Sequence, residues 1–263
     1  MRIALTIAGS DPGGGAGIQA DLKTFAAFGV YGVSAITAVT AQNTLGVDAV
    51  APLSADFVTA QIEAIAGDVG VHATKVGMLA TAAIVEAVAA AIEDLDLPLV
   101  VVDPVLVSSS GERLLDADGV QALFTELLPR ARVVTPNLPE AEALSGRRVR
   151  SDEDAREAAR RIREMGPRAV IITGGHGSGS DVVDVLLDED TFHEFRIQRV
   201  ESKPTHGTGC TYASALAAGL ALGFAMTDAA RDAQQFVAGA IRHALPIGRG
   251  RVVLDHLWRI PKP

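Results

Sequence analysis

The sequence is short of cysteine, aromatic side chains and lysine, and each shortage excludes something. One cysteine in 263 residues rules out an internal disulfide and a zinc site built from clustered cysteines. Aromatic residues make up 4% of the chain, so its core is expected to consist of Ala, Val, Leu and Ile, as in helices packed on a parallel sheet. Only four lysines occur, and the formal net charge of −9 excludes nucleic acid as an expected partner.

Long apolar runs and a leader segment are also missing. No uncharged apolar run is long enough to span a bilayer, so we expect no membrane partner. The N-terminal stretch MRIALTIAGSDPGGG reaches glycine and aspartate before it attains the apolar length of a secretory signal. We therefore expect a soluble cytoplasmic protein. Because there is no composition break, low-complexity tract or internal repeat, residues 1–263 are expected to form a single domain.

Apolar runs alternate with segments of helical periodicity along the whole chain, which predicts an α/β fold with a mostly parallel sheet and helices on both faces. Within the helix expected from residue 54 to residue 68, Ser54 or Asp56 is the expected N-cap, and Phe57, Ile62 and Ile65 are expected to face the core. The strands are expected at 3–8, 33–41, 75–79, 99–102, 132–135 and 169–173, with an antiparallel pair at 181–187 and 191–197; the other helices are expected at 18–28, 81–95, from 139 onwards, 209–222 and 228–245.

Polar or glycine-rich turns follow several of these strands. They are the Gly9 loop, Gln42, Asp103, Asn137 with Glu140, and Gly174 with Gly175. Ligands in open α/β sheets collect at the carboxyl ends of the strands, so these groups are expected to converge on one site. Any one of them has a structural interpretation too, for example a strand-end Asp103 that accepts backbone N–H groups.

The first glycine loop runs from Gly9 to Gly17, between a predicted strand and a predicted helix. It lacks the lysine of a P-loop, and a GxGxxG match that begins at Gly13 fails because Ile18 stands where the third glycine is needed. A loop that lets a ligand approach the backbone is favoured over a flexible linker.

A second glycine turn, from His206 to Thr211, precedes a small-residue helix. Helix N-termini leave backbone N–H groups unpaired, which makes them anion sites, and glycine lets a bulky anion come close. The only cysteine, Cys210, lies in this turn, where a helix terminus is expected to lower the pKa of its thiol. From this segment alone, a proton-handling Cys210 and a small buried core residue remain open alternatives.

Taken in order, the stretches resemble the ribokinase-like superfamily, and within it the hydroxymethylpyrimidine/phosphomethylpyrimidine kinases of thiamine biosynthesis. The resemblance covers most of the chain and is carried by TIAGSDPGGGAGIQADLKTF, TAVTAQNTLGV, KVGML, DPV, TPNLPEAEAL, GGH and HGTGCT. It implies a three-layer ribokinase-like sandwich that uses ATP and Mg²⁺ to phosphorylate 4-amino-5-hydroxymethyl-2-methylpyrimidine and then its monophosphate, and it suggests a homodimer.

The resemblance also implies roles for particular residues. It places the pyrimidine near Gly9, Ala16, Asp21, Gln42, Met78 and Val105; the nucleotide near Asn137, Gly174, Gly175, Thr205 and Thr208; the metal near Asp103 and Glu140; and phosphoryl transfer at Gly207, Thr208, Gly209 and Cys210. The Gln42 amide has the donors and the acceptor that an aminopyrimidine edge requires. Met78 as core filling and Glu140 as a first-turn acid on a helix dipole are the structural alternatives.

Two positions depart from the family pattern. Thr173 stands where the family commonly has a lysine before Gly-Gly-His, and Tyr212 stands where it usually has leucine. Because a lysine at position 173 could approach the ATP phosphates, its absence leaves open which residue makes that contact. Residues 108–111, small and polar, are a candidate lid.

Three other functions remain as alternatives at this point. A pyridoxine or pyridoxal kinase of the same fold acts on a ring that also carries a hydroxymethyl group. An NAD-dependent oxidoreductase is prompted by the first glycine loop but lacks its third glycine. A nucleotide- or pyrimidine-binding protein without catalytic activity would bind both ligands and release no ADP.

Overall fold

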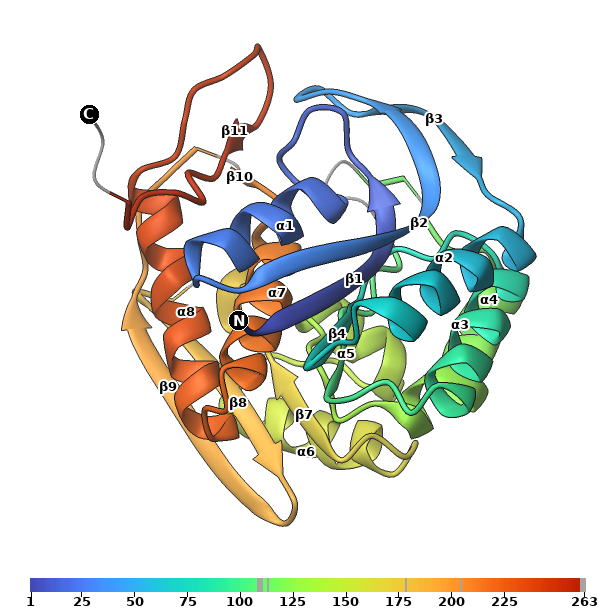
Figure 1. The fold of residues 1–263 in the computed structure, drawn as a ribbon. Coiled ribbons are helices and arrows are strands. Elements are labelled where there is room, and N and C mark those ends of the chain that lie inside the picture. Colours follow the sequence, from blue (N-terminus) through green and yellow to red (C-terminus); the bar gives the residue numbers. More distant parts are fainter. Residues whose placement is uncertain (108–110, 113, 178, 204, 261–263) are drawn as a thin grey trace.

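The computed structural model describes residues 1–107, 111–112, 114–177, 179–203 and 205–260. Its centre is a sheet in the order β3-β2-β1-β4-β5-β6-β7-β8-β9 (Figure 1). Neighbours from β2 to β7 pair in parallel, whereas β3 and β9 are joined to the sheet by antiparallel pairing, as is β8. The strands are β1 (Ile3–Ser10), β2 (Tyr31–Gln42), β3 (Val47–Pro52), β4 (Ala73–Val76), β5 (Val100–Val102), β6 (Val133–Val134), β7 (Ala169–Ile172), β8 (Asp181–Asp188) and β9 (Thr191–Gln198).

Helices cover both faces of the sheet, as predicted. One apolar core lies beneath α1 (Gly17–Ala27), α7 (Thr208–Ala221) and α8 (Met226–Arg242), and the other beneath α2 (Ala55–Asp68), α3 (Ala82–Asp94), α4 (Ala117–Ala122), α5 (Leu138–Ser145) and α6 (Asp152–Arg163). Strand β5 shows how the sequence serves both cores. Val100 and Val102 join one core and Val101 joins the other, because successive side chains of a strand point to opposite faces.

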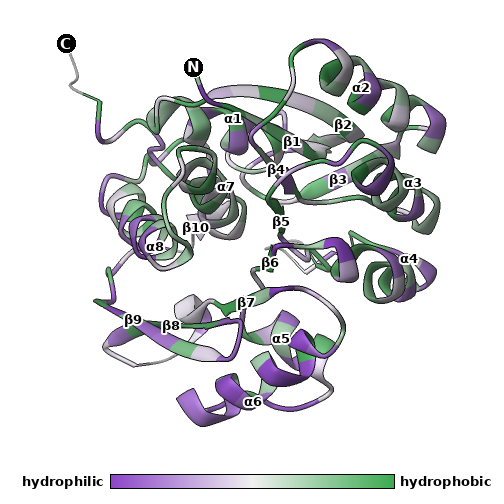
Figure 2. Ribbon diagram, turned by 60° about the horizontal axis from the view of Figure 1, so that its bottom comes forward, coloured by the Kyte–Doolittle hydropathy of each residue, from purple (hydrophilic) through white to green (hydrophobic). Residues whose placement is uncertain are grey.

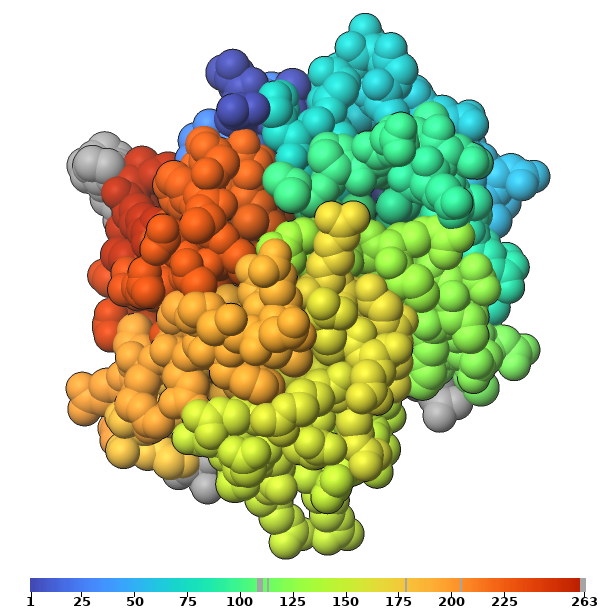
Figure 3. Space-filling view, turned by 90° about the horizontal axis from the view of Figure 1, so that it is seen from below, coloured from blue at the N-terminus to red at the C-terminus, as the bar shows by residue number. Residues whose placement is uncertain are grey.

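Helix α7 is the most enclosed helix of its layer. Every residue from Thr211 to Ala221 is buried, and the small side chains let α1 and α8 pack against it. Helix α6 is the opposite case: only alanines and Ile162 of its inner side are buried, and it is largely hydrophilic in Figure 2. The space-filling view shows the orange C-terminal helices between the blue N-terminal segment and the β8–β9 region (Figure 3).

The predicted helices and strands are present, although some begin or end at other residues than expected. One residue that was predicted to face the core does not. Ser54 caps α2 by accepting a hydrogen bond from the backbone N–H of Phe57, so Phe57 lies in the first turn and is 58% exposed. The prediction that it faces the core is wrong, whereas Ile62 is buried as expected. The sequence patterns did not predict β3, α4, α6, or the two-stranded sheet of β10 (Thr205–His206) and β11 (Val252–Val253). In the described part of the chain, no helix is long and apolar enough to cross a membrane.

The two glycine turns, far apart in the sequence, touch each other. Gly207, the N-cap of α7, has a φ of 87°, and a Cβ placed on it would lie 1.8 Å from the backbone oxygen of Gly15. Only glycine fits a left-handed conformation and so close an approach at once. The contact places the N-terminus of α7 directly against the loop that precedes α1.

Replacing Gly207 by alanine is expected to destabilise the fold, because both the backbone strain and the clash with Gly15 must be relieved. We expect a loss of about 3 kcal/mol or more in the free energy of unfolding, measured by urea denaturation. Gly223 is the matched control, since its φ is 90° and a Cβ there meets nothing within 4 Å. Gly223→Ala should lose only the strain, about 1–2 kcal/mol; equal losses in the two variants would contradict the importance of the contact.

Candidate active site

A cleft of about 830 Å³ lies at the carboxyl ends of the parallel strands. It runs from the first glycine loop, past the N-terminus of α7, to β8, β9 and α8. Most residues expected at the site line it: Gly9, Ala16, Gln42, Met78, Asp103, Val105, Asn137, Glu140, Gly175, Thr205, Gly207, Thr208, Gly209 and Cys210. The strand-end turns therefore meet at one cleft, with the exception of Gly174.

Two of the expected residues, Asp21 and Gly174, do not line the cleft. Asp21 is fully buried, so its carboxylate is enclosed by protein and a direct contact with a ring in the cleft does not fit. Gly174 instead packs against β8: its N–H donates to Asp184 at 2.8 Å, and a Cβ on it would collide with the backbone oxygen of Val183. Both residues support the site from behind.

The Asp21 carboxylate is the centre of a buried polar network. It accepts hydrogen bonds from the Lys75 ammonium at 3.0 Å, the Thr6 hydroxyl at 2.6 Å and the Ser214 hydroxyl at 2.6 Å. All four side chains are completely buried. Burial lowers the pKa of Lys75, but the negative groups around it, Asp21 above all, outweigh burial and raise it, so Lys75 stays charged.

Cys210, the third residue of α7, is half-buried beside this network. The prediction that the helix terminus lowers its pKa is wrong. Burial raises the pKa of the thiol to about 12, the negative charges of Asp103 and Asp21 act in the same direction, and the positive charge of Lys75 only partly opposes them. The thiol is therefore protonated at neutral pH, and it lies beside the carboxylate of Asp103, whose pKa it lowers.

Asp103 and Glu140 bring two carboxyl groups into the middle of the cleft. Burial raises the pKa of Glu140 to about 8, with the nearby Asp103 acting in the same direction, and burial raises that of Asp103 to about 6. Glu140 also forms a capping box at the start of α5, because it accepts from the backbone N–H of Asn137 and donates its own N–H to the Asn137 side chain. Glu140 is thus a first-turn acid of α5 and at the same time lines the cleft.

The far end of the cleft is apolar and lies between β8, β9 and α8. Its lining includes Val182, Ile197, Val237, Ala238 and Ile241, a surface that suits a flat heterocycle.

The short helical turn Gly174–His176 borders this end, and Arg199 holds the backbone on both sides of it. The guanidinium donates from Nη1 to the backbone oxygen of Gly175 at 2.7 Å and from Nε to that of Gly179 at 2.8 Å. Thr173, which stands where the family commonly has a lysine, directly precedes this turn. Arg199 therefore supplies a positive charge at the turn. Of the proposed lid, residues 108–110 lie outside the described residues.

Tyr212, the second departure from the family pattern, is buried in α7 and lines the cleft. The carboxyl group of Asp184 lies next to its hydroxyl, and burial together with this neighbour raises the pKa of Tyr212. Asp184 in turn accepts from Gly174. Tyr212 therefore brings α7 into contact with the group that holds the 174–176 turn.

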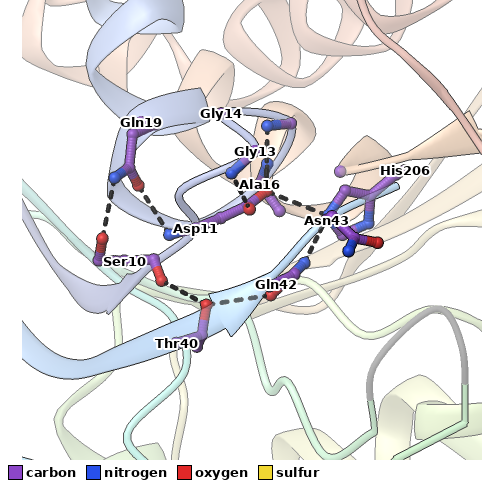
Figure 4. Close-up of polar contacts among 12 residues, drawn as sticks. Ser10, Asp11, Gly13, Gly14, Ala16, Gln19, Thr40, Gln42, Asn43 and His206 are labelled. Carbon is purple, nitrogen blue, oxygen red and sulfur yellow. Dashed lines mark hydrogen bonds and ion pairs between the residues drawn. The ribbon is translucent and has the colours of Figure 1, made fainter. Parts of the chain in front are cut away.

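At the opposite end, Asp11, Gln42 and His206 form a polar cluster (Figure 4). Asp11 accepts from the backbone N–H groups of Gly13, Gly15 and Ala16, which shapes the first glycine loop. His206 Nε2 lies 3.2 Å from Asp11 Oδ2 and 2.8 Å from Gln42 Nε2. The cluster joins β2 and the start of α7 through a single imidazole.

Sequence reasoning missed Lys75, Asp11 and His206 as site residues. A lysine inside the apolar strand Ala73–Val76 was the available signal for Lys75, since a buried ammonium needs an anionic partner. Asp11 and His206 stand inside the quoted motifs but carry no spacing rule of their own. Their contact spans 195 residues of sequence, and only the fold reveals it.

The three-layer fold, with a cleft across the carboxyl ends of its parallel strands and a glycine turn opening α7, is that of the ribokinase-like proteins. A model of the phosphomethylpyrimidine kinase family matches residues 11–255. The chain belongs to this family.

Similar proteins agree with this assignment. The chain is 48% identical over 258 residues to the hydroxymethylpyrimidine/phosphomethylpyrimidine kinase of Streptomyces coelicolor, covering 98% of this chain and 95% of that protein. It is 47% identical over 253 residues to the thiamine biosynthesis bifunctional protein of Geobacter sulfurreducens, covering 96% of this chain but only 52%, about half, of that protein. The solved ADP complex of Bacillus subtilis pyridoxal kinase has a TM-score of 0.91 at 38% identity, covering 99% of this chain and 100% of that one.

The buried pair of Lys75 and Asp21 generates a stability prediction. Lys75→Met leaves the Asp21 carboxylate buried without its cation, and we expect a loss of about 3–5 kcal/mol in the free energy of unfolding, measured in urea. The double variant with Asp21→Asn should recover part of that loss, because no charge then remains unpaired.

Arg231→Met is the control for loss of an ion pair at the surface. Its partner Asp228 is exposed, so the loss should be about 0–1 kcal/mol. A double variant no more stable than Lys75→Met would show that the pairing of the two charges is not what stabilises this region.

Proposed function

We propose that the protein is an ATP-dependent kinase that phosphorylates 4-amino-5-hydroxymethyl-2-methylpyrimidine and then its monophosphate to the diphosphate, in thiamine biosynthesis. The observation that carries the proposal is the position of the α7 N-terminus. Its Gly207–Cys210 turn lines the cleft between the polar end, where Gln42 lies, and the apolar end at β8, β9 and α8. Relatives named for this activity match nearly the whole chain.

The two ends of the cleft suit the two ligands. Gln42 and Met78 offer an amide and a soft apolar surface to the pyrimidine at one end. The apolar residues of β8, β9 and α8 suit the adenine at the other. Between the two ligands, the N–H groups at the N-terminus of α7 bind the phosphoryl group during its transfer. Phosphoryl transfer depends mainly on positioning and on stabilising negative charge.

The carboxylates of Asp103 and Glu140 fit a magnesium ion. Asp103 Oδ2 is buried and has no hydrogen-bond partner among the described residues, and Asp103 raises the pKa of the neighbouring Glu140, so a cation bound between the two groups would favour the ionised form of both. Mg²⁺ is commonly held by one or two carboxylates together with phosphate oxygens and water, so these two side chains suffice on the protein side. When bound, Mg²⁺ would neutralise charge on the phosphates.

Cys210 is proposed to carry the proton in the first phosphorylation. Because its thiol is protonated and lies beside Asp103, the proton of the substrate hydroxyl passes to Sγ while the thiol proton passes to the Asp103 carboxylate. This replaces the free thiolate base expected from the sequence. The second transfer needs no such step, because the attacking phosphate oxygen is already anionic.

The function is tested by coupled ADP release with the hydroxymethylpyrimidine, its monophosphate and pyridoxal offered separately. We expect turnover of both pyrimidines, with a higher kcat/KM for the hydroxymethylpyrimidine than for pyridoxal. ADP release with pyridoxal alone would show a pyridoxal kinase instead. Binding of ATP and pyrimidine without any ADP release would show a binding protein instead.

The role of Cys210 is tested on the two phosphorylations separately. Cys210→Ala should lower kcat for the first step about 100-fold or more, the range of a general acid–base group, and affect the second far less. Cys210→Ser keeps a hydroxyl that relays a proton, so it should retain more of the first activity than alanine does. Equal losses in both steps would contradict the proton role.

Pyridoxal kinase is the second candidate because of one specific observation. The pyridoxal kinase of Bacillus subtilis shares the fold of this chain with a TM-score of 0.91. The main proposal is preferred because the family model and the curated relatives carry the pyrimidine kinase name.

We further propose a homodimer formed at the β3 edge of the sheet. All of β3 is exposed or half-exposed, and large apolar side chains stand out on and beside it, among them Val39 at 48%, Val50 at 37% and Phe57 at 58% exposed. An apolar edge strand of this kind is usually covered by a partner. Sedimentation equilibrium of the purified chain decides between a dimer and a monomer.

A further inference from the structure

The polar end of the cleft contains a conflict of hydrogen-bonding roles at His206. Its Nε2 atom lies 3.2 Å from the acceptor Asp11 Oδ2 and 2.8 Å from the donor Gln42 Nε2 (Figure 4). One ring nitrogen carries either a proton or a lone pair, so it cannot donate to the carboxylate and accept from the amide together. Either the tautomer of His206 or the orientation of the Gln42 amide must resolve the conflict.

Asp11 decides the tautomer. Burial favours its protonated form, but hydrogen bonds from His206 and from the backbone N–H groups of Ala16 and Gly13 outweigh burial and lower its pKa. An ionised carboxylate only accepts hydrogen bonds. His206 Nε2 therefore carries a proton and donates it toward Asp11.

Thr40 imposes a second, independent constraint on the same amide. Its hydroxyl lies 2.9 Å from the backbone oxygen of Ser10 and 3.4 Å from Gln42 Oε1. The carbonyl of Ser10 can only accept, so the single hydroxyl proton goes there. What then faces Thr40 from Gln42 should be a donor, not a second acceptor.

Both constraints are met when the Gln42 amide is turned over. The two ends of an amide have nearly the same size and exchange places by a rotation of about 180°. In the turned orientation Oε1 shares the His206 Nε2–H with Asp11 Oδ2 in a three-centre hydrogen bond, one Gln42 N–H donates to Thr40, and the second N–H is left for the cleft that Gln42 lines.

We infer that His206 is a positioning residue that holds the Gln42 amide with an N–H group toward the cleft, so that this end selects substrates with an acceptor ring nitrogen. The inference rests on the proposed function, in which the ring lies against Gln42. An aminopyrimidine has two ring nitrogens with in-plane lone pairs, whereas a pyridoxal-type ring has one. His206 thus affects which ring is preferred without touching the reacting atoms.

His206→Phe is the main test, because it keeps a flat ring against Gly15 and removes both nitrogens. We expect KM for the hydroxymethylpyrimidine to rise about tenfold, the effect of one lost or misdirected hydrogen bond, while kcat and the KM for ATP change less than about twofold. The preference for the pyrimidine over pyridoxal should fall by a similar factor. His206→Gln, whose amide reaches the same place, should restore part of the preference.

His193→Phe, the same substitution on β9 outside the cleft lining, is the matched control and should leave all these values unchanged. A ¹⁵N NMR measurement of the native protein reads the tautomer directly, and a proton on Nε2 is expected. A bare Nε2, an unchanged KM in His206→Phe, or equal changes for both rings and ATP would overturn the inference. If the native protein does not turn over the pyrimidine, the proposed function fails by itself, and the tautomer measurement still decides the state of His206.

Discussion

The pairing of Lys75 with Asp21 is the interaction on which the site depends most. It places an ammonium in the interior of an apolar strand, which is tolerable only because a carboxylate and its hydrogen-bond donors are buried with it. Asp21 lies on α1 and Ser214 on α7, so the pair also fixes both helices relative to β1 and β4. The pair thereby holds together α1 and α7, the two helices that follow the glycine turns.

The same positive charge determines the electrostatics of the cleft floor. Lys75 lowers the pKa of Cys210 and of Asp103, while burial and the neighbouring carboxylates raise them. The outcome differs between the two groups: Asp103 remains ionised at neutral pH and Cys210 remains a thiol. A helix N-terminus is therefore not enough to produce a thiolate when burial and two negative neighbours oppose it.

Much of the fold was predictable because its signals are local. The apolar run at Val100–Val102, the cap at Ser54 and the glycine turn before α7 each depend on neighbours in sequence. What the sequence could not reveal depends on contacts between distant segments. The burial of Asp21 follows from Lys75 and Ser214, and the role of Asp11 from His206. The prediction for Phe57 was wrong because periodicity defines which face of a helix is apolar but not which of its turns packs against the core.

Substrate choice in this cleft must come from a few polar atoms and not from the fold. A pyridoxal kinase shares the fold with a TM-score of 0.91, so the positions of strands, helices and the α7 turn do not distinguish a pyridine from a pyrimidine. In the proposed site, the apolar side chain of Met78 would fit either ring. The rings differ in their ring nitrogens and in the groups they carry, and an oriented donor detects a nitrogen lone pair. Because an amide orients equally well in two ways, the proposed selection by Gln42 requires that the groups around it, His206 and Thr40, determine its orientation.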